Sequence, residues 1–193
     1  LYTRFCLSDI LVTNTRTAEM AKLAENAFRD VNIAFANELS IVCDDLGIDV
    51  WELIRLANRH PRVNILQPGP GVGGHCIAVD PWFIVDSSPD HSPLIKTSRL
   101  VNDSKPSYVL SKIDEAIKAL PQSAVAPNIG LLGITFKPDI DDIRESPALQ
   151  ITQEVALANP DATVQVVEPN LDSLPRQLQA LSNIEPVSYT HLR

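Results

Sequence analysis

The fold is decided by residues 17–46, which read TAEMAKLAENAFRDVNIAFANELSIVCDDL. Apolar residues recur here at steps of three and four, the period of one face of an α-helix. They are Met20, Leu23, Ala24, Ala27, Phe28, Val31, Phe35, Leu39, Val42 and Leu46. Thr17 is the expected N-cap, and Gly47 is a natural stop. The pattern predicts a helix of about 45 Å, long enough to bridge two domains or to build a subunit interface.

Two further helices are expected in the first two thirds of the chain. Asp49 lies three residues before a glutamate, a capping-box spacing that predicts a short helix at 49–58. Residues 60–81 are dense in proline and glycine and read as a loop. A third helix is expected over 93–120, bent near Pro106 because proline removes a hydrogen bond of the helix.

The pattern changes after a linker at residues 121–127. A buried strand is expected at 128–134, a helix at 146–158 and another strand at 163–167. This order is typical of a parallel α/β domain, here with too few elements for a complete sheet. The expected fold class is therefore a mainly α central domain with a long connecting helix, followed by an incomplete, Rossmann-like α/β domain.

Composition narrows the class of protein. The 193 residues are 45% hydrophobic and carry a net charge of −8, which suits a globular protein and argues against a nucleic-acid or anionic membrane surface. No run approaches the ~18 apolar residues of a membrane span. Cys6, Cys43 and Cys76 are too far apart for a zinc or CxxC site, so we expect reduced thiols in a cytoplasmic protein, with Cys43 in the core.

Three polar residues share one face of the long helix. Lys22, Asn26 and Arg29 fall at i, i+4 and i+7. An ammonium, an amide and a guanidinium on one stripe suit an oxyanion or a phosphate. A solvated helix face is the alternative, and the spacing alone favours it.

A glycine-rich loop ends in a cysteine. Residues 69–76 read GPGVGGHC, so Cys76 follows His75 and precedes Asp80 by four residues. Closely spaced glycines let the backbone pass near a ligand, and a thiol at the end of such a loop suits a nucleophile. The alternative, a buried cysteine acting as a small hydrophobic residue, is equally compatible with the pattern.

A third motif lies between the first expected strand and its helix. Residues 130–139 read GLLGITFKPD, and RESP follows at 144–147. Ser146 suits an N-cap in a turn that could bind phosphate, although the spacing is neither GxGxxG nor that of a P-loop. Lys137 and Arg144 are unusual in a purely structural connection, which is the alternative interpretation.

Together these stretches resemble the UDP-glucose/UDP-N-acetylmannosamine dehydrogenase family over about residues 13–169. The string HPRVN at 60–64 and the loop at 69–76 look like its N-acetylhexosamine branch. The resemblance implies that NAD takes two hydrides while UDP-N-acetyl-D-mannosamine is oxidised at C6 to the uronate, through a cysteine thiohemiacetal and thioester. UDP-GlcNAc or UDP-glucose as substrate, or a non-catalytic helical dimerisation module, are the alternatives.

The resemblance also implies roles for single residues. Cys76 would be the nucleophile, Lys22 would stabilise the oxyanion or relay a proton, and Asn26 and Asp80 would orient water and the oxyanion. The UDP-sugar would be contacted by Arg29, His60, Arg62, Gly73, Phe136 and Lys137, with Arg62 from a neighbouring subunit. Arg144 would reach towards NAD, and the long helix would form a homodimer.

The resemblance gives the expected domain boundaries. Residues 1–13 would be the end of a strand left from an N-terminal NAD-binding domain, and 14–122 the central helical domain. Residues 127–186 would be a truncated UDP-binding domain, and 187–193 a non-native or disordered tail. We therefore expect an internal piece of an enzyme that cannot turn over by itself.

Overall fold

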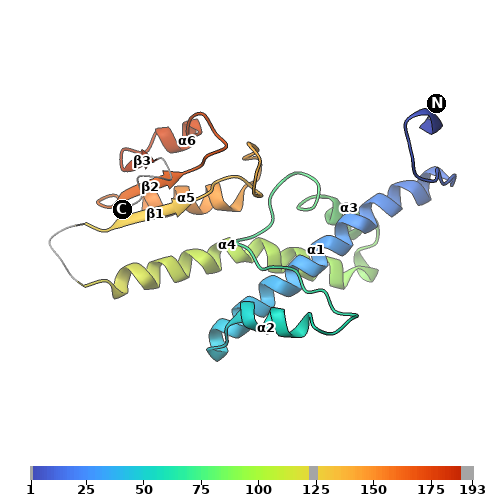
Figure 1. Ribbon diagram of the computed structural model, residues 1–193, viewed down its shortest axis with the longest axis horizontal. Coiled ribbons are helices and arrows are strands. Elements are labelled where there is room, and N and C mark those ends of the chain that lie inside the picture. Colours follow the sequence, from blue (N-terminus) through green and yellow to red (C-terminus); the bar gives the residue numbers. More distant parts are fainter. Residues whose placement is uncertain (1, 122–125, 188–193) are drawn as a thin grey trace.

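The computed structural model describes residues 2–121 and 126–187. Two long helices, α1 and α4, cross and pack against each other, and a small α/β domain lies above α4 (Figure 1). The first part contains η1 (Tyr2–Arg4), α1 (Thr15–Leu46), α2 (Val50–Ala57), α3 (Asp80–Ser87), η2 (Pro89–His91) and α4 (Pro93–Ala119). The second contains β1 (Asn128–Leu132), α5 (Pro147–Ala158), β2 (Thr163–Val167), α6 (Arg176–Gln179) and β3 (Ile184–Pro186).

Helix α1 forms as predicted, but its start differs. The side chain of Asn14 accepts a hydrogen bond from the Thr17 N–H at 2.9 Å, so Asn14 is the N-cap and the prediction of Thr17 was wrong. Both residue types cap helices well, and the apolar pattern could not choose between them. The helix ends at Gly47 with φ +66°, as the sequence predicted.

The chain before α1 is not a strand. Residues 2–13 are exposed and hold only the 3-10 turn η1, so the expected strand end is absent there. A strand needs a neighbour to pair with, and the described residues offer none to this segment. The predicted tail lies, except for residue 187, outside the described residues, as does most of the expected linker.

The predicted later helices are present, and the structure adds α3, α6, the 3-10 turn η2 and the strand β3, which were not predicted. Asp49 caps α2 by accepting from the N–H groups of Trp51 and Glu52, and α4 continues through the buried Pro106. Helix α3 was not predicted, because proline and glycine dominate the residues before it and it begins only at Asp80, with Pro81 in its first turn.

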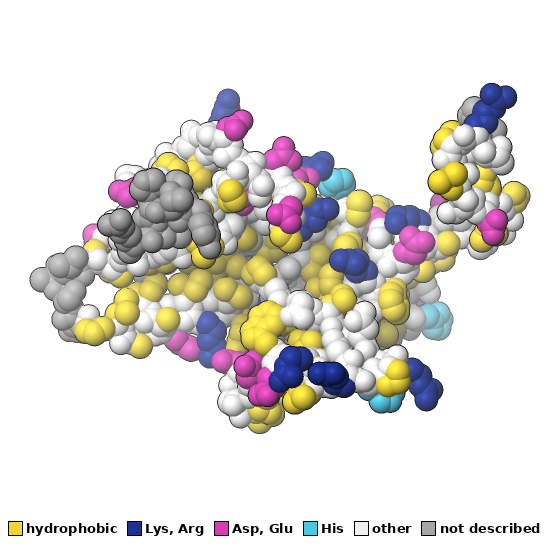
Figure 2. All heavy atoms as spheres, in the orientation of Figure 1, with side chains coloured by type: hydrophobic (Ala, Val, Ile, Leu, Met, Phe, Trp, Pro, Cys, Tyr) yellow, Lys and Arg dark blue, Asp and Glu magenta, His cyan; other side chains and the backbone are white. Residues whose placement is uncertain are grey.

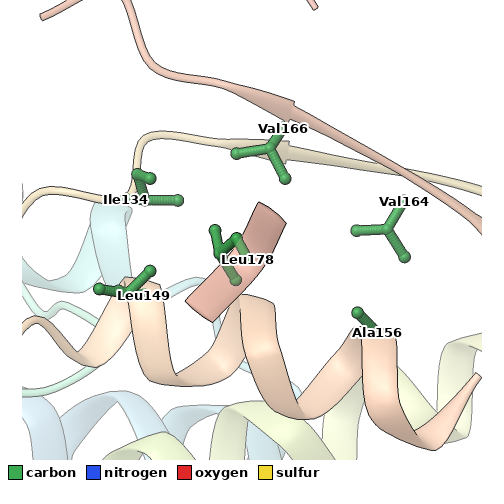
Figure 3. Packing of buried hydrophobic residues seen from close by; sticks show 6 residues of the cluster. All are labelled: Ile134, Leu149, Ala156, Val164, Val166 and Leu178. Atoms are coloured by element: carbon green, nitrogen blue, oxygen red, sulfur yellow. The ribbon is translucent and has the colours of Figure 1, made fainter. Parts of the chain in front are cut away.

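The sheet is parallel, in the order β1-β2-β3. Asn128 lies opposite Thr163, and Val164 lies opposite Ile184. Side chains from the sheet, α5 and α6 meet in one core beneath the strands (Figure 3). They are Ile134, Leu149, Ala156, Val164, Val166 and Leu178. This arrangement confirms the expected fold class of a mainly α part followed by a Rossmann-like α/β part.

Several large apolar side chains of helix α1 point away from its own chain. The face that packs on α4 carries Asp30 and Asn37, both fully buried. Phe28, Phe35 and Leu46 are instead 72%, 56% and 63% exposed. Other apolar side chains gather where α4 meets the α/β domain (Figure 2). In the part of the chain that the structure describes, no helix has the length and apolarity needed to cross a membrane.

Candidate functional site

The candidate site begins where α1 meets the first residue of α3. The amide nitrogen Nδ2 of Asn26 donates to Oδ2 of Asp80 at 2.5 Å. The backbone N–H of Asp80 donates to the carbonyl oxygen of Cys76 at 2.8 Å, which closes the turn after the glycine-rich loop. The structure therefore brings together Asn26, Asp80 and Cys76, although Asn26 and Asp80 are 54 residues apart in sequence.

The Cys76 side chain is open to solvent. Cys76 and its neighbour His75 are exposed, so this cysteine is not a small hydrophobic residue of the core. Cys43, in contrast, is 2% exposed, as the sequence predicted. An exposed thiol on a shaped loop is available to react with a substrate.

Charged groups of the segment after β1 face this thiol. The Arg144 side chain donates three hydrogen bonds to Asp142 and its backbone N–H donates a fourth, which hold the pKa of that carboxyl at about 2, with a smaller contribution from His75. The pKa of Arg144 is raised, mainly by its hydrogen bonds to Asp142 and to a smaller extent by its proximity to Cys76. The guanidinium predicted to reach towards NAD therefore lies on the thiol side of the loop, with its side chain 64% exposed.

The two other cations predicted on α1 point into solvent. Lys22 lies one turn before Asn26 and pairs with Glu25 at 3.1 Å, with both side chains at least 66% exposed. Arg29 is also exposed. Within the described residues, neither cation makes a hydrogen bond or ion pair with Cys76. The two cations therefore share a helix face with Asn26, as predicted from their spacing, but do not contact the thiol.

The glycine-rich loop packs directly on the α/β domain. The N–H of Gly74, whose φ is +78°, donates to the carbonyl oxygen of Arg144 at 3.1 Å. A Cβ added to Gly73 would lie 2.5 Å from the carbonyl oxygen of Glu145 and 2.6 Å from Cβ of Phe136. Gly73 and Phe136, both predicted to contact substrate, are therefore adjacent. Lys137 places its ammonium 5.6 Å from the centre of the Phe136 ring.

His60 and Arg62 form a separate group after α2. The N–H of Arg62 donates to Nδ1 of His60 at 3.3 Å, and both residues are exposed. No hydrogen bond among the described residues joins either of them to the glycine-rich loop.

A cleft of about 990 Å³ adjoins the site. His75, Val79 and Trp82 form one wall, while Asp103 and Gln150 come from α4 and α5. Neither Cys76 nor Lys22 belongs to the lining of this cleft. The cleft therefore lies beside the thiol rather than around it, between the helical part and the α/β domain.

Sequence reasoning missed a buried polar network between α1 and α4. Arg99 donates to Asp30 at 2.5 Å, and both are almost fully buried. Burial raises the pKa of Asp30, and the opposing effect of Arg99 does not bring it back to its ordinary value. Asn37 and Asn102 continue the network. The available signal was Asp30 and Asn37, two polar residues seven positions apart in an apolar helix.

Glu168, at the end of β2, was also missed, and it bears on the cofactor. Its carboxylate accepts from the N–H groups of Ile134 and Thr135 at 2.9 and 3.3 Å. Burial raises the pKa of Glu168, but these backbone bonds and those of Asn170 outweigh it and leave the pKa below its ordinary value. The backbone amides that follow β1, which hold a pyrophosphate in a dinucleotide-binding turn, are thus already bound by an internal anion. This turn does not fit NAD.

Two family descriptions match successive parts of the chain. Residues 16–104 match the central domain of the UDP-glucose/GDP-mannose dehydrogenase family, and residues 130–191 match the UDP binding domain of the same family. The first match lies in the helical part and the second in the α/β part, with residues 105–129 between them. They cover the glycine-rich loop, Cys76 and the segment after β1.

Individual proteins are similar over nearly the whole chain. A UDP-N-acetyl-D-mannosamine dehydrogenase of Campylobacter jejuni is 60% identical over 97% of this chain, and an NDP-N-acetyl-D-galactosaminuronic acid dehydrogenase of Ralstonia nicotianae is 58% identical over 94%. The solved UDP-N-acetyl-mannosamine dehydrogenase Cap5O of S. aureus is 44% identical over 97%, with a TM-score of 0.76. The chain spans 45%, 42% and 45% of these relatives, respectively.

Proposed function

We propose that this chain, which belongs to the UDP-glucose/GDP-mannose dehydrogenase family, forms the central and UDP-binding parts of a cytoplasmic UDP-sugar 6-dehydrogenase. The observation that carries the proposal is the exposed thiol of Cys76, held by the bonds from Asp80 and Asn26 at the edge of a cleft. The proposed domain boundaries are 14–122 for the helical part and 127–186 for the α/β part, with residues 1–13 the end of an NAD-binding domain.

Cys76 acts as the covalent nucleophile in this proposal. After the C6 alcohol has lost a hydride and a proton, the thiolate attacks the aldehyde carbon, and a carbon–sulfur bond forms in a thiohemiacetal. Loss of a second hydride from C6, together with the hydroxyl proton, gives a thioester. Water then attacks the carbonyl carbon, the carbon–sulfur bond breaks with the thiolate as leaving group, and the uronate carboxylate is released while two protons pass to solvent. The covalent bond keeps the aldehyde from escaping.

The residues around the thiol stabilise the charges of these steps. Asn26 and Asp80 are already hydrogen-bonded to each other, which orients the amide and carboxylate for the attacking water. Lys22, one turn earlier on the same face, exchanges its exposed partner Glu25 for the developing oxyanion. A surface ion pair of this kind contributes little stability, so releasing it costs little.

The hydride acceptor proposed is NAD. When bound, each NAD molecule would accept one hydride from C6, so the oxidation of the alcohol to the carboxylate would use two NAD molecules in succession. The turn after β1 does not fit a dinucleotide, so the proposal needs a nucleotide-binding domain from another part of the enzyme. Arg144 is the residue of this chain that would face the cofactor from the thiol side.

The substrate proposed is UDP-N-acetyl-D-mannosamine, in agreement with the name of the C. jejuni relative. Phe136 and Lys137, beside Gly73, would hold the sugar or uridine, and Arg29 would contact the nucleotide sugar from α1. The R. nicotianae relative, which carries a different N-acetylhexosamine in its name, makes the sugar itself the least constrained part of the proposal.

A homodimer through α1 completes the proposal. The exposed side chains of Phe28, Phe35 and Leu46 lie on the face of α1 that its own chain leaves uncovered. Burying them against a second copy removes apolar surface from water, a gain of roughly 25 cal/mol per Å². In this dimer Arg62, which is exposed beside His60, would contact the UDP-sugar bound to the partner, while His60 would be a further contact to the UDP-sugar.

The test of the chemistry is a pair of cysteine variants in the full-length polypeptide that contains these residues. Cys76→Ser should reduce uronate formation from UDP-N-acetyl-D-mannosamine by at least about a thousandfold, because the nucleophile is lost. Cys6→Ser is the matched control, since Cys6 is also exposed but lies far along the chain from the site. Uronate is measured by mass spectrometry. Unchanged activity of Cys76→Ser would show that the assignment is wrong.

The same protein separates the alternatives. Comparing kcat/KM for UDP-N-acetyl-D-mannosamine, UDP-GlcNAc and UDP-glucose identifies the sugar. Sedimentation of Phe28→Asp and Phe35→Asp measures the dimer, and each should dissociate it because a charge enters an apolar contact. If the dimer is present but none of the three UDP-sugars is oxidised, the chain is a helical dimerisation module instead.

A further inference from the structure

The interface between α1 and α4 is unusually polar for a helix pair. Asp30 and Asn37 on α1 and Arg99 and Asn102 on α4 are all at most 1% exposed. Two of their buried atoms, Oδ2 of Asp30 and Nε of Arg99, find no hydrogen-bond partner among the described residues. Apolar side chains would fill such an interface at lower free energy. The polar groups therefore need a reason other than stability.

The bonds form one directed chain. The Asp30 carboxylate accepts from Arg99 at 2.5 Å and from Nδ2 of Asn102 at 2.8 Å. The carbonyl oxygen of the Asn102 side chain is then left to accept from Nδ2 of Asn37, at 2.9 Å. The side-chain oxygen Oδ1 of Asn37 accepts from the backbone N–H of Gly69, at 2.8 Å.

The carboxylate sets the direction of every amide in this chain. An ionised carboxylate only accepts hydrogen bonds, so Asn102 must turn its amino group towards Asp30. The oxygen of Asn102 then requires the amino group of Asn37, and the oxygen of Asn37 is left facing Gly69. Neither amide can flip without placing two acceptors or two donors together.

Gly69 is the first residue of the glycine-rich loop. The loop is fixed at Gly74 by Arg144 and after Cys76 by the bond between Asp80 and Asn26. Without the Asn37 bond, its first residues would have one anchor fewer. A buried amide locked by its own network holds the loop more firmly than an exposed side chain, which loses more rotamer freedom on binding.

We propose that Asn37 is a positioning residue for the reaction, fixing the start of the glycine-rich loop and through it the place of the Cys76 thiol. This inference rests on the proposed function for its catalytic consequence, but not for its structural part. Asn37 does not touch substrate. Its effect therefore appears in kcat and in the mobility of the loop, and only weakly in KM.

The test compares Asn37→Ala with Lys105→Met in the full-length polypeptide. Lys105 is buried in the same interface and contacts the Asn37 carbonyl and Ser40, but not Gly69. Both variants should lower Tm. Only Asn37→Ala should raise amide hydrogen exchange in the peptide containing residues 69–76 by at least about tenfold, the effect expected when a bond worth about 1.4 kcal/mol is lost. It should also lower kcat about tenfold or more, with KM changed less than about threefold.

Each outcome decides. Exchange and kcat changed only in Asn37→Ala support the proposal. Unchanged exchange, or faster exchange with unchanged kcat, overturns it, as does an equal loss of kcat in Lys105→Met. If the wild type oxidises none of the three UDP-sugars, the proposed function fails, while the exchange data still decide whether Asn37 holds the loop. If Asn37→Ala does not fold, Asn37→Ser replaces it, since its hydroxyl is too short to span Gly69 and Asn102.

Discussion

Gly73→Ala is the sharpest perturbation of the contact between the glycine-rich loop and the α/β domain. The added Cβ would lie 2.5 Å from the carbonyl oxygen of Glu145, 2.6 Å from Cβ of Phe136 and 2.9 Å from Cδ of Pro147. The first two atoms belong to the backbone or are attached to it directly, so no side-chain rotation can move them away. The methyl group must therefore displace the loop or the segment after β1.

The magnitude follows from the geometry. Overpacking a well-packed site costs about 1–3 kcal/mol, and three contacts below 3.0 Å with rigid atoms place Gly73→Ala near the upper limit. For a chain of this size, that free energy lowers Tm by about 5–10 °C. The loop that leads to Cys76 is displaced at the same time, so uronate formation should fall as well.

Gly69→Ala is the matched control in the same loop. The nearest atom to a Cβ added there is the carbonyl oxygen of Gly71, at 3.9 Å, so the methyl group fits. Thermal unfolding of the two purified variants should give a Tm for Gly69→Ala within about 2 °C of the wild type. Equal Tm values for Gly73→Ala and Gly69→Ala would refute the packing of the loop on the α/β domain.

Three other predictions concern charge and turnover. Arg99→Met leaves Asp30 buried without its cation and should lower the free energy of unfolding, measured in urea, by about 3–5 kcal/mol. The double variant Asp30→Leu/Arg99→Met should lose clearly less than the sum of the two single variants, and additive losses would contradict the coupling. The pKa of Glu168 in the folded protein lies below 4.5, so the stability that this carboxylate contributes is complete at neutral pH and is lost as the pH falls through the folded pKa. The Tm difference between wild type and Glu168→Gln should therefore shrink below pH 4.5, and a difference that stays constant with pH would contradict this role of Glu168. The 193-residue chain by itself should form no NADH from NAD and a UDP-sugar, because an acceptor must be held ~3–3.5 Å from the donor carbon, and measurable NADH would overturn this.

Local patterns predicted most of the helices and strands. The apolar period gave α1, capping residues gave α2 and α5, and the short apolar runs at 128–134 and 163–167 gave β1 and β2. Helix α3 was not predicted because it follows directly on a loop rich in proline and glycine and has Pro81 in its first turn, and α6 and β3 are too short to show a periodic pattern. The cap of α1 was misplaced because Asn14 and Thr17 are both good caps, and only the backbone path selects one.

The site was predictable as a set of residues but not as an arrangement. Sequence placed Asn26 on a helix and Asp80 after a loop, and only the fold shows that the two bond to each other. The outward direction of Phe28 could not be read from periodicity, because an apolar stripe does not say which surface will cover it. The roles of the individual site residues remain predictions.

Helix α1 contains neither proline nor glycine between Thr15 and Leu46, so it is a continuous, stiff helix of about 48 Å. Neighbouring residues of α1 point to different surroundings. Phe28 lies on the uncovered surface, Arg29 points into solvent, and Asp30 belongs to the buried network. The effect of a substitution in α1 should therefore depend on the helix face that the residue occupies, and not on its position along the helix. Substitutions a few residues apart would impair dimer assembly, catalysis or folding in turn. No segment of α1 could therefore be replaced as a whole without loss.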